Sequence, residues 1–189
     1  MTVFEIADTE GPQQIGTFSA TLFGTRGELA PGTWDRTVKR AGRQDRLRIE
    51  ISPLGLNRAG DVQTDVLRGS WNLGREHEVP RFYIRIAQWL PQTSQYVTLV
   101  HELAHVFCGH LGKPKGAPWP DRHNHLSKAQ RELEAEAVAY LVSSRAGIET
   151  RAAEYLAGYI SDGDVEKISV AQIVWAANHI EKLGAARGT

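Results

Sequence analysis

The segment 97–112, VTLVHELAHVFCGHLG, constrains the fold more than any other part of this sequence. Its apolar residues recur at helical spacing in two adjoining stripes, so a helix formed here buries most of its surface. Three polar residues, His101, Glu102 and His105, interrupt these stripes in the order H-E-x-x-H. Because a buried charged or unpaired polar group costs free energy, these side chains need partners or a metal ion.

The spacing of these three residues suits a metal site on a helix. Residues four apart share one helical face, so His101 and His105 can point at the same ion. Glu102 is turned by about 100° from His101, which places it near a water on the metal without making it a ligand. The pattern therefore predicts a zinc site with two histidine ligands and Glu102 as general base. The alternative is a pair of core histidines satisfied by hydrogen bonds, with Glu102 at a solvent edge.

A catalytic zinc ion usually takes a third protein ligand. The extended pattern H-E-x-x-H-x-x-G-x-x-H is absent, because Cys108 and Leu111 stand where glycine and histidine are required. The nearby candidates are His110, His123, His125 and the carboxylates of segment 131–142, RELEAEAVAYLV.

A helix over this second segment favours one of its glutamates. On a helical wheel Glu132 and Glu136 lie in the middle of an apolar arc, whereas Glu134 points toward the expected solvated face. Two carboxylates stacked on a buried face repel each other unless a cation lies nearby. We therefore predict Glu132 as the third zinc ligand and Glu136 as the group that holds a ligand histidine by its other ring N–H. The alternative is an amphipathic helix with ordinary surface glutamates.

The chain changes character near residue 90. Before it, RLRIEI (46–51) and RFYIRI (81–86) alternate like half-buried strands, with a loop-like connection between them, and 81–86 is a candidate sheet edge for peptide binding. After it we expect four helices. They run from 91 to about 111, from a Ser127–Gln130 capping box to Arg145 with Gly147 as stop, from Thr150 to about Ile160, and from a cap at Asp162 or Asp164 to Leu183. We expect residues 1–80 to form a β-rich or irregular N-terminal region of unknown role, and 81–189 to form the core with its C-terminal helices, as one compact unit.

The segments TLVHELAH and ELEAEAVAYLV together resemble the ImmA/IrrE family of bacterial metallopeptidases and, more loosely, the peptidase domain of ArdC-like antirestriction proteins. The resemblance covers about residues 80–160, with Glu132 and Ala135 completing an E-x-x-A pattern. It implies an α+β, minimal zincin-like fold of the gluzincin type, with a small, mostly antiparallel sheet packed on the H-E-x-x-H helix and a helical C-terminal half. It also implies a zinc-dependent endopeptidase acting on a protein or peptide substrate, such as a transcription repressor.

The composition limits the kinds of partner and the cellular compartment that we expect for this chain. The chain has 22 basic and 22 acidic residues, so no overall charge attracts it to nucleic acid or to a membrane surface. A single cysteine excludes internal disulfides and Cys-rich zinc sites. Neither a signal peptide nor an apolar run of membrane-spanning length is evident. We expect a cytoplasmic protein.

Other residues keep further hypotheses open. His123, His125 and Tyr140 are candidates for stabilising an oxyanion or contacting substrate, and Cys108 is expected to be a small buried hydrophobe. The basic segment 35–48 motivates a DNA- or repressor-binding module with structural or lost zinc. A third hypothesis is a phage-defence or toxin–antitoxin component that waits for an activator.

Overall fold

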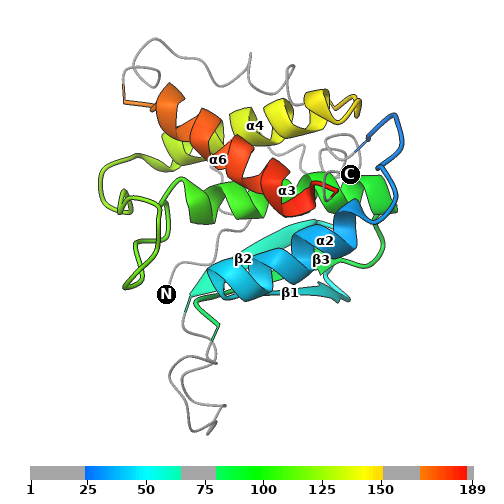
Figure 1. The fold of residues 1–189 in the computed structure, drawn as a ribbon, viewed down its shortest axis with the longest axis horizontal. Coiled ribbons are helices and arrows are strands. Elements are labelled where there is room, and N and C mark those ends of the chain that lie inside the picture. Colours follow the sequence, from blue (N-terminus) through cyan, green and yellow to red (C-terminus); the bar gives the residue numbers. More distant parts are fainter. Residues whose placement is uncertain (1–23, 65–79, 151–166, 187–189) are drawn as a thin grey trace, which may run out of the picture.

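The computed structural model describes residues 24–64, 80–150 and 167–186, which form an α+β fold (Figure 1). In chain order its elements are α2 (Thr33–Arg40), a short π-helix (Ala41–Asp45), β1 (Leu47–Ser52), β2 (Gly60–Thr64), β3 (Phe82–Ala87), α3 (Gln92–Phe107), α4 (Lys128–Arg145) and α6 (Val170–Gly184). The helix expected at 150–160 lies, apart from its first residue, outside the described residues. None of the described helices is long and apolar enough to cross a membrane.

The three strands form a mixed sheet in the order β1-β3-β2. β1 runs parallel to β3, with Leu47 opposite Phe82, and β2 runs antiparallel to β3, with Gly60 opposite Ile86. The strands predicted at 46–51 and 81–86 are thus confirmed, but the sheet is mixed rather than mostly antiparallel. The expected boundary at residue 80 falls within this sheet, since β1 and β2 precede it and β3 follows it.

β3 occupies the centre of the sheet and β2 lies at an edge. The edge role predicted for 81–86 is therefore wrong, because β1 and β2 already use both sides of that strand's backbone. β2 itself was missed, because its sequence GDVQT contains one large apolar residue, Val62, within a polar stretch.

α3 lies between the sheet and the helices α4 and α6 (Figure 1). Leu99, Val100, Leu103 and Val106 are fully buried, which confirms that this helix packs on most of its sides. It ends at Phe107, a turn earlier than predicted, and Gly109 then takes a left-handed backbone conformation with φ of 75°.

Gly109 also determines how closely the next loop approaches. A Cβ atom there would lie 2.1 Å from the carbonyl oxygen of Pro120, so only glycine permits this contact. The Arg122 N–H donates to the Gly109 carbonyl at 3.0 Å. The loop that carries Arg122 and His123 is thereby fixed against the end of α3.

The second predicted helix is confirmed as α4. Ser127 and Gln130 form the expected capping box, and Gly147 has a φ of 74° just beyond the helix end. The last helix, α6, begins later than predicted, because Ser169 caps it by accepting from the Gln172 N–H. The caps expected at Asp162 or Asp164 lie outside the described residues.

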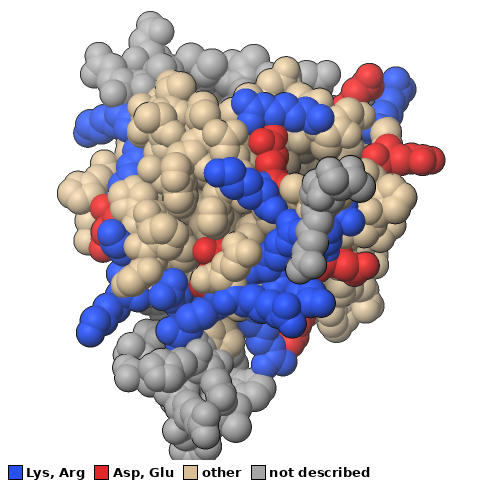
Figure 2. Space-filling model, in the orientation of Figure 1, with Lys and Arg blue, Asp and Glu red and all other residues tan. Residues whose placement is uncertain are grey.

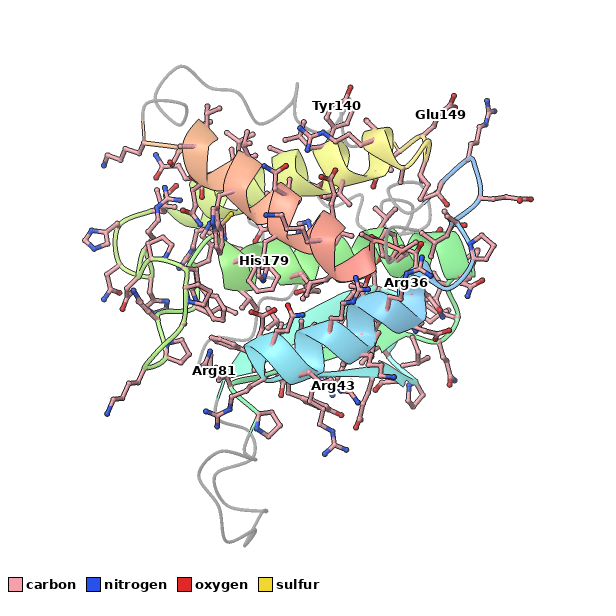
Figure 3. The ribbon with its side chains drawn as sticks, viewed as in Figure 1. Arg36, Arg43, Arg81, Tyr140, Glu149 and His179 are labelled. Carbon is pink, nitrogen blue, oxygen red and sulfur yellow. The ribbon has the colours of Figure 1, made fainter. Side chains whose placement is uncertain are left out.

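The basic segment 35–48 includes most of helix α2, which was not predicted from the sequence. Arg36 donates to the Gly184 carbonyl at 2.8 Å, and Arg40 donates to the carbonyls of Lys182 and Ala185, each at 2.8 Å. These guanidinium groups satisfy the carbonyls at the C-terminal end of α6, which have no partners within their own helix. Lys and Arg side chains gather on this face of the molecule (Figures 2 and 3). Two of them, Arg36 and Arg40, stabilise the fold through these hydrogen bonds.

Candidate metal centre

The packing of α4 against α3 brings three ligand-type atoms together. The Nε2 atoms of His101 and His105 lie 3.2 Å apart. Glu132 Oε2 lies 3.4 Å from the first of these nitrogens and 3.6 Å from the second. The predicted ligand set thus meets at one point, although Glu132 comes from a different helix.

The dimensions of this triangle suit zinc. A tetrahedral zinc ion with bonds of about 2.0–2.1 Å separates its ligand atoms by about 3.3–3.4 Å. The observed separations of 3.2, 3.4 and 3.6 Å bracket that value. The side chains of His101 and Glu132 are 20% and 19% exposed, so the group is reachable from solvent. Two imidazoles and one carboxylate form a donor set typical of zinc sites with an open position.

The electrostatics of the group favour a cation. Burial would lower the pKa of His101, but contacts with Glu132 and Glu136 outweigh it and hold that pKa well above its usual value. Burial would raise the pKa of Glu132, yet the neighbouring His105 and His101 hold it well below its usual value. In the metal-free protein a proton on His101 thus offsets the carboxylates, and a metal ion would replace that proton.

Glu102 lies beside the triangle and under the edge strand. It is 9% exposed. Burial raises its pKa, although His101 and His105 oppose the shift. A Cβ atom at Gly60 of β2 would lie 3.2 Å from Glu102 Oε1 and 2.7 Å from a methyl group of Thr98, so the strand backbone passes close over this carboxylate. A carboxylate with a raised pKa is suited to taking up and returning a proton.

Glu136 lies where sequence analysis expected it. Its Oε1 is 3.4 Å from His101 Nδ1, the ring nitrogen that does not face Glu132. This geometry is suitable for fixing the orientation of the His101 ring.

The three candidates for substrate contacts are more dispersed. His123 directs its Nδ1 to the His110 carbonyl oxygen at 2.9 Å, and His125 is exposed in the same loop. Tyr140 is 39% exposed and projects outward from α4 (Figure 3). Their proposed roles stay predictions.

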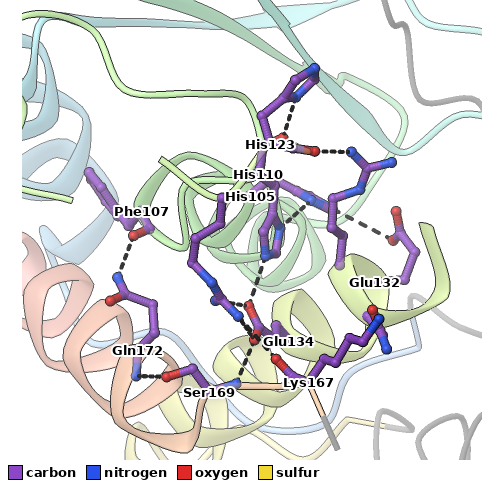
Figure 4. Close-up of polar contacts among 12 residues, drawn as sticks. His105, Phe107, His110, His123, Glu132, Glu134, Lys167, Ser169 and Gln172 are labelled. Atoms are coloured by element: carbon purple, nitrogen blue, oxygen red, sulfur yellow. Dashed lines mark hydrogen bonds and ion pairs between the residues drawn. The ribbon is translucent and has the colours of Figure 1, made fainter. Parts of the chain in front are cut away.

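The expectation for Glu134 is wrong, because this side chain is fully buried rather than solvated. Its two oxygens accept from Arg122 at 2.6 and 2.8 Å and from the Ser169 N–H at 2.7 Å, and they lie 2.9 Å from His110 Nε2 (Figure 4). The start of α6 and the loop after α3 cover this face of α4. A signal was present in the sequence, since Val138 and Leu141 share that face and are apolar.

His110 is fully buried within this second group. Burial lowers its pKa to about 4, so its ring is neutral near pH 7. His110 is a candidate zinc ligand by its place in the sequence, but both of its ring nitrogens already have partners, at His105 and Glu134.

Residues 62–159 match the family model of the IrrE N-terminal-like domain, a peptidase family. The match spans just over half of the chain, from β2 to beyond α4, and it includes every residue of the candidate centre. The chain therefore belongs to this family, which confirms the resemblance inferred from the motifs. No curated protein and no solved structure gave a significant match.

Proposed function

We propose that this protein is a zinc-dependent endopeptidase that holds zinc through His101, His105 and Glu132. The observation that carries the proposal is the triangle of ligand atoms, with sides of 3.2, 3.4 and 3.6 Å, beside a buried carboxylate. Membership in a peptidase family supports the same reaction class. Bound zinc would polarise a scissile carbonyl and make a water molecule more acidic.

Glu102 is the catalytic base in this proposal. Its carboxylate accepts a proton from the attacking water and delivers it to the leaving amine. Burial, which raises its pKa, makes both transfers easier near neutral pH. Glu136 orients the His101 ring through its Nδ1 atom.

The edge strand β2 is the proposed docking site for substrate. It lies at one side of the described sheet, and Gly60 brings its backbone to Glu102. An extended peptide that adds to this edge gains main-chain hydrogen bonds and passes beside the proposed catalytic base. Because Gly60 has no side chain, the backbone of β2 can lie this close to Glu102.

The physiological substrate we propose is a regulatory protein in the bacterial cytoplasm, such as a transcription repressor. This rests on the ImmA/IrrE resemblance and on the family match. The alternative of a DNA-binding module is disfavoured, because Arg36 and Arg40 of the basic segment bind the end of α6.

The test is a Glu102→Gln variant, which keeps the shape of the side chain and removes its basicity. With labelled casein and a fluorogenic peptide library as probes, the variant should retain about one zinc per chain and lose cleavage by at least about 100-fold. Glu149→Gln is the matched control, since Glu149 is exposed (Figure 3). A Glu102→Gln protein that cuts any probe as fast as wild type would contradict the mechanism.

A further inference from the structure

The two ligand histidines differ in what holds their second ring nitrogen. His101 relies on a partly exposed carboxylate, Glu136. His105 instead places its Nδ1 at 3.0 Å from the Nδ1 of His110, which is fully buried. On the other side of the His110 ring, Nε2 lies 2.9 Å from Glu134, and Arg122 donates two hydrogen bonds to that carboxylate (Figure 4).

One arrangement of protons satisfies this whole chain of contacts. If the Nε2 of His105 binds a metal ion, its Nδ1 carries the proton and donates it to the Nδ1 of His110. His110 must then carry its own proton on Nε2, where it donates to Glu134. Glu134 remains a carboxylate because Arg122 and the Ser169 N–H also donate to it.

Two of these residues also belong to a second group of potential metal ligands, since the ligand atoms of Cys108, His110 and Glu134 lie within 4.8 Å of one another. Their hydrogen bonds argue against a metal site there. Glu134 already accepts from Arg122 and Ser169, and both ring nitrogens of His110 are engaged. A metal ion would have to displace the partly buried guanidinium group of Arg122, and burial also raises the pKa of the Cys108 thiol. The group is therefore a closed hydrogen-bond network.

We propose that His110, anchored by Glu134 and Arg122, is a positioning residue that fixes the tautomer and orientation of His105 and thereby sets zinc affinity. This inference rests on the zinc centre proposed above. It assigns a purpose to a buried histidine that the proposed chemistry does not otherwise use. It also links zinc affinity to the start of α6, which donates the Ser169 N–H to the same carboxylate.

Zinc affinity, measured by competition with a chelator, tests the proposal. His110→Leu removes both hydrogen bonds and should weaken zinc binding by about 10–100-fold. His110→Gln can both accept and donate, so it should recover most of that loss. The matched control is His179→Leu, because His179 also pairs with a buried carboxylate, Asp45 at 3.1 Å, but packs on Phe107 rather than on a ligand. The control should lower thermal stability and leave zinc affinity unchanged.

A measurement on the wild-type protein covers the case in which a variant fails to fold. Long-range ¹⁵N NMR of the histidine rings in the zinc-loaded protein should show His105 protonated at Nδ1 and His110 protonated at Nε2 alone. A proton on Nδ1 of His110, or equal zinc affinities for His110→Leu and wild type, would overturn the inference. A wild-type protein that binds no zinc would instead overturn the proposed function, and this inference with it.

Discussion

Two adjacent groups of potential metal ligands, each including a glutamate of helix α4, look alike in composition. One contains His101, His105 and Glu132, and the other contains Cys108, His110 and Glu134. In the first, ligand atoms face one another across 3.2–3.6 Å and two of the side chains are partly exposed. In the second, all three residues are buried and Glu134 is saturated by N–H donors. Proximity of ligand-type residues therefore does not define a metal site, because a carboxylate saturated by N–H donors cannot bind an ion without losing them.

Replacing one glutamate from each group should separate their roles most strongly. Glu134→Ala removes a fully buried carboxylate and leaves the partly buried Arg122 without it, which should lower the free energy of unfolding of the zinc-free protein by about 3 kcal/mol. Glu132→Ala should abolish stoichiometric zinc binding and change that free energy much less, because Glu132 is partly exposed. Urea unfolding in the presence of a chelator, together with zinc titration, measures both quantities.

The comparison fails if the two variants exchange these phenotypes. A Glu132→Ala protein that keeps full zinc binding would show that the ligand is another residue. A Glu134→Ala protein as stable as wild type would show that the buried network contributes little to folding.

Glu136→Ala should have an intermediate effect. Loss of the contact with His101 Nδ1 should weaken zinc binding by about 10–100-fold, while excess zinc still fills the site. Chelator competition provides the affinity, and Glu149→Ala is the control for removing a glutamate from the surface. Wild-type affinity in Glu136→Ala would reduce this residue to an ordinary glutamate of the helix face.

The smallest effect concerns pH in the zinc-free protein. Burial would lower the pKa of His101, but Glu132 and Glu136 raise it well above its usual value. A raised folded-state pKa stabilises the protein fully below the unfolded-state pKa, and this contribution is lost as pH rises through the folded-state value. The melting temperature of wild type should thus exceed that of His101→Asn below about pH 6.5, and the gap should close as pH rises. A gap that widens with pH would contradict the assigned sign.

Local patterns predicted the parts of the fold that depend on neighbouring residues. The strand alternation of 46–51, the capping box at Ser127 and the apolar stripes of α3 all appear as expected. The spacing of the H-E-x-x-H motif and the helical wheel of α4 together predicted His101, His105 and Glu132, whose ligand atoms lie close together in the structure.

The elements that were missed depend on distant partners. α2 is highly charged, and its arginines bind carbonyls at the end of α6, more than 140 residues away. Glu134 was assigned to solvent because the wheel shows only its own helix, whereas its donors come from Arg122 and Ser169. A helical wheel cannot show which face a later helix covers.

X-ray absorption spectroscopy of the zinc-loaded wild-type protein tests the central claim most directly, because it distinguishes the two groups beside α4 by their ligand atoms. Binding by His101, His105 and Glu132 predicts a first shell of nitrogen and oxygen alone, at about 2.0–2.1 Å. Zinc held by the other group would include the thiolate of Cys108, with a zinc–sulfur distance of about 2.3 Å. A sulfur signal at that distance would contradict the account, and a shell of nitrogen and oxygen alone is the result it predicts.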